Sequence, residues 1–318
     1  FGILLAYQIL REGVSSNYYY QLGNRPLSIG ISGDSGSGKS TYSTGLANLF
    51  GKKSTLEVSG DDYHKWDRNS PEWQKQTHLD PKSNKLFEMV RDVKKLLEGH
   101  SVYARSYDHS SGKFLPNQKI KSSDLILVNG LHSLYIKQLI DELDVKIFIE
   151  MNEELKYSLK MQRDVKERGR LENTVKDMIS KRQPDYNKFI KPQADRADVV
   201  FNLSPVISEK NNKKFEKLDL IVTAHLKNGI YYNELVNVLK SICLLQVDII
   251  SIDDKGEVII EVTGNVLPNN AKIAVNKLLP NIDELLGYEA EFSTGALGIM
   301  QIITLMEIDE VMKKRKKR

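Results

Sequence analysis

A glycine-rich segment with a lysine and a serine at fixed spacing is the part of this sequence with the clearest chemistry. Residues 33–40 read Gly-Asp-Ser-Gly-Ser-Gly-Lys-Ser, the pattern of a phosphate-binding loop. Glycines let successive backbone N–H groups turn toward a phosphate, at the positive end of the helix that follows. Lys39 would reach the β- and γ-phosphates, and the Ser40 hydroxyl would ligate Mg²⁺. The segment predicts ATP or GTP binding through Gly33, Asp34, Ser35, Gly36, Ser37, Gly38, Lys39, Ser40 and Thr41.

Two adjacent carboxylates form a second candidate site. Asp61 and Asp62 follow a predicted strand at 55–59 and precede His64 and Arg68. A kinase that phosphorylates a hydroxyl benefits from a carboxylate that accepts its proton. Either aspartate could be this base. An acidic turn alone would not explain the histidine and arginine that follow.

Four charged residues recur at helical spacing further along the chain. Lys160, Arg163, Asp164 and Arg168 stand at i, i+3, i+4 and i+8, so one helical face would carry all four. This stripe could be a solvated ion-pair face. It could equally bind an oxyanion and use its one acid for a metal.

Alternating strands and helices would bring these groups to one edge of a sheet. The expected strands are 27–31, 55–59, 124–130, 145–149 and 199–203, with helices at 41–50 and 83–98. Open α/β sheets bind ligands at the carboxyl ends of their strands. The strand at 124–130 carries Asn129 near its end, where a phosphate-loop protein usually has an acid. We predict an α/β fold of the P-loop NTPase type, with a doubly wound, mostly parallel sheet and a smaller α+β C-terminal part.

The chain divides into three predicted parts. Residues 1–24 read as a helix and connector, which we interpret as the tail of a preceding domain absent from this chain. Residues 25–204 form the predicted P-loop core, and residues 205–318 form the predicted C-terminal part, with a linker-like segment at 211–214 near its start. That last part is expected to hold a strand at 218–226, a helix at 232–242, a hairpin at 247–262, and helices at 270–286 and 296–314. The hairpin could extend the sheet or form a dimer contact.

Composition limits the partners of the protein. The formal net charge is +4, but the last six residues are all basic, so the rest of the chain is slightly acidic. We interpret this basic tail as a solvated helix end and expect neither nucleic acid nor membrane as a partner. No apolar run is long enough to span a membrane. The single cysteine, Cys243, excludes an intramolecular disulfide and fits a buried thiol in a reducing cytoplasm.

At these motifs the sequence resembles the phosphoribulokinase/uridine kinase family, and its phosphoribulokinase branch in particular. The resemblance covers about residues 25–204 and continues more weakly at 293–303. Its motifs are the phosphate loop, the Gly60–Arg68 block, Tyr107-Asp108-His109-x-x-Gly112, Asn129-Gly130-Leu131-His132, the 163–169 segment and the 181–200 segment.

The resemblance implies a role for each matching residue. Asp61 would be the general base, and Lys39, Arg163 and Asp164 would join it in catalysis. The implied substrate contacts are His64, Arg68, Tyr107, His109, Lys160, Arg163 and Arg168. The implied Mg²⁺ ligands are Ser40, Asp61, Asp164 and Asn129.

Two positions depart from the family pattern. Asn129 replaces the acid at the strand end, so it can offer a carbonyl oxygen to a metal but no negative charge. Ser37 stands where light-regulated members carry a cysteine, so thiol–disulfide switching of that kind is excluded.

We therefore expect a cytoplasmic, homodimeric kinase that uses ATP and Mg²⁺ to phosphorylate a hydroxyl of a small sugar phosphate, a pentose or polyol phosphate. The basic residues favour an acceptor that carries its own phosphate. The alternatives are a uridine-type nucleoside kinase and a catalytically degenerate ATP-binding regulatory domain.

Overall fold

The computed structural model describes residues 25–68, 70–167, 169, 171–206, 219–229, 232–280, 282, 285–287 and 290–316. The predicted N-terminal helix at 1–24 and the linker at 211–214 lie outside these residues. Arg168 also lies outside them, as does the side chain of Arg163.

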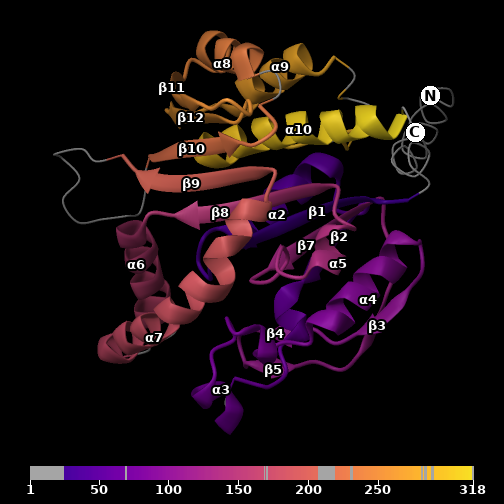
Figure 1. Cartoon of the computed structure of the whole chain (residues 1–318), viewed down its shortest axis with the longest axis vertical. Helices are drawn as coiled ribbons and strands as arrows, with labels where there is room; N and C mark the ends of the chain where they lie inside the picture. The colour runs from indigo at the N-terminus through magenta and orange to yellow at the C-terminus, as the bar shows by residue number, and fades with distance from the viewer. Residues whose placement is uncertain are drawn as a thin grey trace, which may run out of the picture.

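One eight-stranded sheet runs through the molecule (Figure 1), in the order β11-β12-β10-β9-β8-β1-β7-β2. Its strands are β1 (Leu27–Gly33), β2 (Thr55–Ser59), β7 (Leu125–Gly130), β8 (Val145–Met151), β9 (Val199–Pro205), β10 (Leu220–Leu226), β11 (Gln246–Ile252) and β12 (Val258–Thr263). The neighbours from β2 to β9 pair in parallel, and the remaining pairs are antiparallel. The predicted mostly parallel, doubly wound sheet is confirmed.

The centre of the sheet is its most apolar part. Every residue of β1 and of β7 is buried, as expected of parallel strands that are covered on both faces. From β1 the chain moves out to β2, returns to β7 beside β1, and then crosses to β8 on the other side. This reversal of strand order leaves a crevice at the carboxyl ends of the strands, and the phosphate loop follows β1 there.

Helices cover both faces of the sheet. On one face, α2 (Lys39–Phe50), α8 (Tyr232–Ser241), α9 (Pro268–Leu278) and α10 (Gly295–Lys316) share one core with β1 and β8. On the other face, α4 (Leu86–Leu97) and α5 (Lys137–Ile140) pack on β7. The remaining elements are α3 (Pro71–Lys75), α6 (Glu153–Met161), α7 (Glu172–Asp185) and two small hairpin-like pairs: β3 (Val102–Ala104) with β6 (Gln118–Ile120), and β4 (Tyr107–Asp108) with β5 (Lys113–Phe114).

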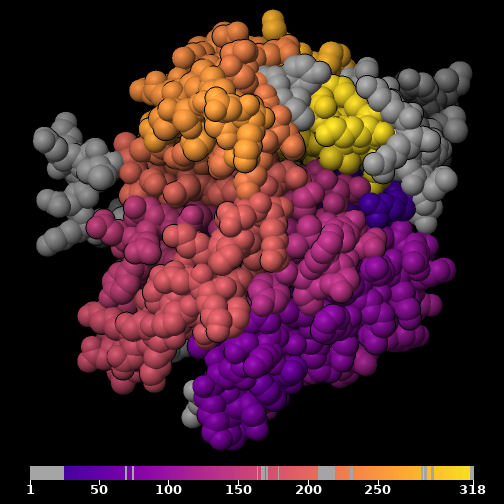
Figure 2. Space-filling model, in the orientation of Figure 1, coloured from indigo at the N-terminus to yellow at the C-terminus, as the bar shows by residue number. Residues whose placement is uncertain are grey.

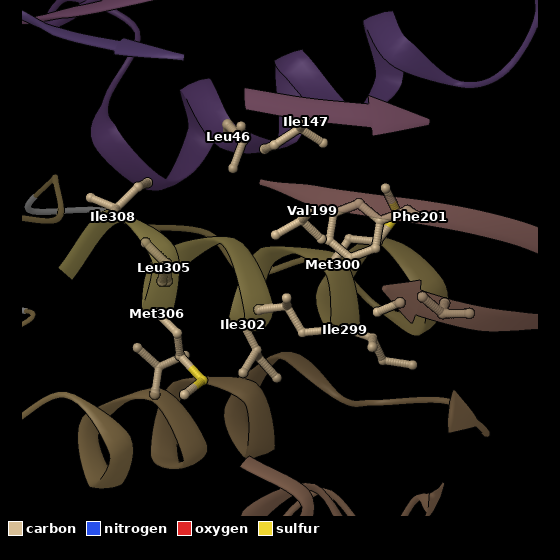
Figure 3. Close-up of a cluster of buried hydrophobic side chains, with 14 of the residues drawn as sticks. Leu46, Ile147, Val199, Phe201, Ile299, Met300, Ile302, Leu305, Met306 and Ile308 are labelled. Carbon is tan, nitrogen blue, oxygen red and sulfur yellow. The ribbon is translucent and has the colours of Figure 1, made fainter. Parts of the chain in front are cut away.

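The long helix α10 is buried on all sides over residues 298–308. Figure 3 shows it between the sheet and a further helix layer, with Met300 beside Val199 and Phe201. The buried polar residues of this helix need hydrogen-bond partners, because an unsatisfied polar group in a core is costly. Gln301 donates to the Gly45 carbonyl at 2.8 Å and accepts from the Ser293 amide at 2.8 Å.

Two predictions for the C-terminal part need comment. The predicted helix at 270–286 is wrong beyond Leu278, where α9 ends. Pro280 disfavours helical backbone at the preceding residue, and Leu279 has φ −133° and ψ 80°. The hairpin at 247–262 forms β11 and β12 and extends the central sheet. In Figure 2 the orange and yellow surface of the C-terminal elements directly adjoins the magenta and salmon surface of the elements that precede them.

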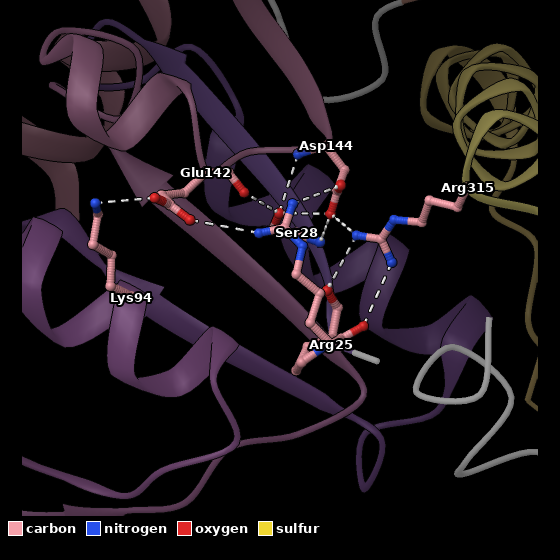
Figure 4. A network of polar contacts seen from close by, with 7 residues as sticks. Arg25, Ser28, Lys94, Glu142, Asp144 and Arg315 are labelled. Atoms are coloured by element: carbon pink, nitrogen blue, oxygen red, sulfur yellow. Dashed lines mark hydrogen bonds and ion pairs between the residues drawn. The ribbon is translucent and has the colours of Figure 1, made fainter. Parts of the chain in front are cut away.

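The C-terminal tail is only partly solvated. Lys313 and Lys314 are exposed, but the Arg315 side chain is 12% exposed and forms an ion pair with Asp144 (Figure 4). The prediction of a solvated helix end is therefore wrong at Arg315. Within the described residues, no helix combines the length and the apolar character needed to cross a membrane.

Candidate active site

The phosphate loop begins where β1 ends, at Gly33. A side chain there would place its Cβ 2.2 Å from the Ile149 carbonyl oxygen, so only glycine allows β1 and β8 to approach. Gly36 and Gly38 have φ values of 87° and 88° and face open space, which leaves a cradle of backbone groups. The Ser37 hydroxyl, inside this turn, is buried and has no hydrogen-bond partner among the described residues. An orphaned donor beside an open cradle fits a bound phosphate.

Cations surround the loop at Asp34. Lys156 Nζ lies 3.2 Å from Asp34 Oδ2, and an Arg182 nitrogen lies 3.8 Å from Asp34 Oδ1. Burial acts to raise the pKa of Asp34, but Arg182, Lys156, Lys160 and Lys39 outweigh it and lower the pKa. Lys39 Nζ also donates to the Asp34 backbone oxygen at 2.6 Å. These four cations converge where the phosphates of a nucleotide would lie.

A cavity of about 450 Å³ runs from this loop to the start of α10. Its polar end is formed by Gly36 to Thr41, and its apolar end includes Leu203, Leu297 and Met300. A cavity with one polar and one apolar end suits a nucleotide, which has phosphates at one end and a flat base at the other.

A second cavity of about 360 Å³ lies between α6 and α7, lined by Lys156, Arg182 and Tyr186 among others. Lys160 lines both cavities. It is 6% exposed, and Asp164 is 2% exposed, so neither stands on a solvated face. Beyond α6 the helix continues as a π-helical segment, Gln162–Glu167, which changes the spacing assumed for one common face. Of the four predicted residues, the structure therefore describes two side chains, and both are buried.

Asp61 lies at the carboxyl end of β2, in the short helical turn Gly60–Tyr63. Its two carboxylate oxygens face two histidines, with His64 Nε2 and His109 Nε2 each at 3.3 Å. Burial opposes ionisation, but the hydrogen bond and positive charge of His64 and the neighbouring histidines bring the pKa of Asp61 below its usual range. A carboxylate that is held ionised between two imidazoles can accept a proton from a substrate hydroxyl.

Asp62 has a different environment. Its Oδ1 accepts the Tyr107 amide hydrogen at 2.6 Å, and Arg105 donates to its backbone oxygen at 3.3 Å. Burial, with a smaller contribution from Asp61, raises the pKa of Asp62 to about 6, although the Tyr107 hydrogen bond opposes the shift. Asp62 therefore ties the β4–β5 pair to β2. Of the two aspartates, Asp61 is the one whose carboxylate oxygens meet His64 and His109, while the carboxylate of Asp62 binds a backbone amide.

Four of the seven predicted substrate contacts, His64, Arg68, Tyr107 and His109, lie together beside Asp61. Arg68 donates to the His109 backbone oxygen at 2.9 Å, and its guanidinium lies 5.9 Å from the centre of the Tyr107 ring. The Tyr107 and His109 rings meet edge to face at 5.2 Å, and the His64 and Tyr107 rings at 5.6 Å. His64 is positioned by Asn84, whose Oδ1 lies 2.6 Å from His64 Nδ1.

The sequence analysis missed two rings in this cluster. Trp73 stacks between His78, at 5.0 Å, and Tyr107, at 6.3 Å. His78 is half-buried, and burial together with the nearby positive charge of Arg182 lowers its pKa. Thr77 donates to Asp185 of α7 at 2.6 Å, so this segment also connects the acceptor side to the cations of α7. In the sequence, the aromatic residues that follow β2 were the signal that could have indicated these two rings.

Asn129 lies at the end of β7 and is 6% exposed. Its Nδ2 donates to Glu57 Oε1 at 2.9 Å. No group of three His, Cys, Asp or Glu side chains suited to a metal occurs among the described residues. Mg²⁺ does not require one, because in kinases it binds through one or two side-chain oxygens, phosphate oxygens and water. Ser40 in the first turn of α2 and Asn129 at the neighbouring strand end fit such a partial ligand set.

A phosphate loop between β1 and α2, together with a carboxylate that follows the carboxyl end of the parallel strand β2, is typical of a P-loop protein of the kinase type. Comparison with known proteins agrees: the model of the Phosphoribulokinase / Uridine kinase family matches residues 28–208. The chain belongs to this family.

Several relatives were found by sequence. The chain is 35% identical over 192 residues to a phosphoribulokinase of Synechocystis, covering 60% of this chain and 58% of the relative. It is 36% identical over 194 residues to the chloroplastic phosphoribulokinase of Spinacia oleracea, covering 56% and 48%. A uridine kinase of Clostridium perfringens is 30% identical over 180 residues, covering 55% of this chain and 86% of the relative. The matches thus span about half the length of the first curated relatives.

The fold also matches a solved structure over nearly its whole length. The phosphoribulokinase from Rhodobacter spheroides superposes with a TM-score of 0.64 and 20% identity, covering 92% of this chain and 99% of that one. The similarity in fold therefore includes the antiparallel strands and α10, beyond the region that the family model matches.

Proposed function

We propose that this protein is a Mg²⁺-ATP-dependent kinase that transfers the γ-phosphoryl group to a hydroxyl of a small sugar phosphate, a pentose or polyol phosphate. The observation that carries the proposal is Asp61, which follows the carboxyl end of β2 and is held between His64 and His109. The named phosphoribulokinase relatives support the same class of acceptor.

In the proposed reaction, the acceptor oxygen attacks the γ-phosphorus while its proton passes to Asp61 Oδ. The bond between the γ-phosphorus and the bridging oxygen breaks, and ADP leaves with the negative charge. Lys39 and the loop amides hold the phosphates in line, so catalysis is mostly positioning and charge neutralisation. Mg²⁺, when bound, would neutralise charge on the β- and γ-phosphates, and Ser40, Asp61, Asp164 and Asn129 are the candidate oxygen ligands.

The arrangement of charge favours a phosphorylated acceptor over a nucleoside. Arg68 lies beside Tyr107 and His109, and Lys156, Lys160 and Arg182 line the second cavity, between α6 and α7. We propose that Arg163 and Arg168 add to this set. A nucleotide alone does not need so many cations, whereas an acceptor dianion does.

The test is ATP consumption by the purified chain with Mg²⁺ and a panel of acceptors: ribulose 5-phosphate, other pentose and polyol phosphates, uridine, and no acceptor. Turnover with a sugar phosphate that is lost in Asp61→Asn supports the proposal. Turnover with uridine alone would replace it with a nucleoside kinase. Tight ATP binding without turnover on any acceptor would favour a regulatory domain, for which the uncharged Asn129 is the structural argument.

We also propose that the protein is a homodimer. The edge strand β11 exposes Ile249, Ile250 and Ile252 by 43%, 56% and 52%. An edge strand with unpaired backbone groups and apolar side chains can pair with a second copy. Light scattering on the wild type and on Ile250→Lys tests this: a wild-type dimer that becomes a monomer is expected, and a wild-type monomer contradicts it.

A further inference from the structure

The end of β7 carries an uncharged side chain at the corner where a metal would meet the phosphate loop. Asn129 shares its face of β7 with Leu125 and Leu127, which pack in one core with Tyr42 and Leu46 of α2. Asn129 therefore points to the face of the sheet that carries the phosphate-loop helix. Along the strands it pairs in register with Ile31 of β1, two residues before the loop.

A carboxylate on the neighbouring strand holds this asparagine. Glu57 lies on β2, two residues before Ser59, which is the register partner of Asn129. Asn129 Nδ2 donates to Glu57 Oε1 at 2.9 Å. Because a carboxylate can only accept, it selects the NH₂ end of the amide. Strand β7 lies between β2 and β1. With its nitrogen drawn toward β2, the planar amide presents its carbonyl oxygen on the side of β1 and the phosphate loop.

We propose that Glu57 is a positioning residue for the Mg²⁺ site. Glu57 fixes Asn129 with its carbonyl oxygen toward the phosphate loop. Its carboxylate also supplies negative charge behind Asn129, at a strand end whose own side chain is uncharged. The inference rests on the proposed Mg²⁺-nucleotide function. A residue that hydrogen-bonds to a metal ligand orients that ligand and raises its basicity. Here the hydrogen bond from the amide N–H to the carboxylate polarises the amide and increases the negative charge on its carbonyl oxygen.

The competing explanation is a cross-strand pair that stabilises the edge of the sheet, since β2 is an edge strand. The two explanations differ in what they predict about metal. A cross-strand pair affects only folding stability, whereas a positioning residue changes how much Mg²⁺ strengthens nucleotide binding.

The experiment is calorimetric titration of the full chain with ADP, with and without Mg²⁺. The quantity compared is the ratio of the two dissociation constants, which we call the Mg²⁺ enhancement. In Glu57→Gln, ADP affinity without Mg²⁺ should stay within about twofold of wild type, while the Mg²⁺ enhancement should fall about tenfold. Glu98→Gln, an exposed glutamate at the end of α4, is the matched control and should match wild type.

A double variant that moves the carboxylate from position 57 to position 129 should restore the Mg²⁺ enhancement. In the double variant Glu57→Gln/Asn129→Asp, the new glutamine can donate to the new carboxylate, so the pair is kept with its charge at the strand end. Its Mg²⁺ enhancement should return at least to the wild-type value. Asn129→Asp alone places two carboxylates in contact, so it should lower the melting temperature of the apo chain.

Two failures are distinguishable. If ADP does not bind with or without Mg²⁺, the proposed function itself is wrong. If ADP binds but Glu57→Gln keeps the wild-type Mg²⁺ enhancement, or the folded double variant does not recover it, Glu57 has no positioning role. A loss of melting temperature in Glu57→Gln with unchanged Mg²⁺ enhancement would identify a cross-strand pair only and overturns the inference.

Discussion

At the scale of single residues, Asp61 and Asp62 are neighbours in the chain whose carboxylates have different partners. Asp61 faces two imidazoles, and Asp62 accepts a backbone hydrogen from Tyr107. The histidines lower the pKa of the Asp61 carboxyl group, whereas burial raises the pKa of the Asp62 carboxyl group. Two isosteric substitutions therefore separate proton transfer from structural support.

Asp61→Asn keeps the size of the side chain but removes the proton acceptor. We expect kcat to fall by about 10²–10⁴-fold, the usual contribution of a general base. ADP affinity should stay close to wild type, because the phosphate loop is untouched. Steady-state kinetics and calorimetry measure both. Near-normal turnover in this variant would remove Asp61 from the base role.

Asp62→Asn should act on stability and its pH dependence. Since the pKa of Asp62 is raised to about 6, the folded chain holds a proton between about pH 4 and 6 that the unfolded chain has released. The stability due to this group is therefore present at low pH and is lost as the pH rises through that window.

Asparagine removes the buried charge and its oxygen still accepts the Tyr107 hydrogen. Above about pH 7 the Asp62→Asn variant should melt at a higher temperature than wild type, and the difference should vanish near pH 4. Thermal melts across this range give the comparison. A variant that is less stable at every pH would show that the charge itself supports the fold.

At the scale of elements, two glycines set the distance between the ends of β2 and β7. A Cβ on Gly60 would lie 3.1 Å from Gly130 Cα, and a Cβ on Gly130 would lie 2.9 Å from Gly60 Cα. The backbones touch here, immediately before Asp61 and after Asn129. The close approach brings Asp61 and the strand-end amide of Asn129 to one corner of the sheet.

Gly60→Ala should separate these strand ends by a few tenths of an ångström. We expect kcat to fall by about 10–100-fold, because small misplacements of a catalytic group are costly, with a loss of stability of about 1–3 kcal/mol. Gly130→Ala should behave alike. Kinetics and chemical denaturation test this, and an unaltered kcat in both variants would mean that the corner adapts without consequence.

At the scale of the whole molecule, α10 runs from the cavity beside the phosphate loop to the amino-terminal ends of the central strands β1 and β8. Its first turns contribute Leu297 and Met300 to the cavity. Its 22 residues span about 33 Å, and near its end Arg315 forms an ion pair with Asp144, which also accepts from Ser28 and Arg25 (Figure 4). The basic tail thus fastens the helix that lines the nucleotide site.

Arg315→Ala leaves Asp144, whose side chain is 7% exposed, with one partner fewer. Removing one partner of a largely buried ion pair costs about 3–5 kcal/mol; because Arg25 and Ser28 remain, we expect about 2–3 kcal/mol. Lys314→Ala, at an exposed position, is the control and should be near neutral. Denaturant unfolding gives both values. Equal, small losses of unfolding free energy in the two variants would mean that the contact between Arg315 and Asp144 does not stabilise the fold.

The sequence by itself determined the local parts of this protein. The phosphate loop, the strand before it and the helix after it follow from glycine spacing and apolar periodicity, which act within a few residues. The strands near 27, 55, 124, 145 and 199 and the buried Cys243 were predicted for the same reason. The family motifs also identified Arg68, Tyr107 and His109, which the fold brings together.

Tertiary structure decided whatever depends on residues distant in the chain. Only the sheet order shows that β10 to β12 continue the kinase core, and only packing separates Asp61 from Asp62. Trp73 joins the ring cluster by stacking with Tyr107, His78 joins it by stacking with Trp73, and Arg315 turns inward to Asp144. Glu57 meets Asn129 because β2 and β7 are neighbours, 72 residues apart in sequence. Sequence periodicity does not predict such contacts, since they form only when helices and strands that are distant in the chain pack against one another.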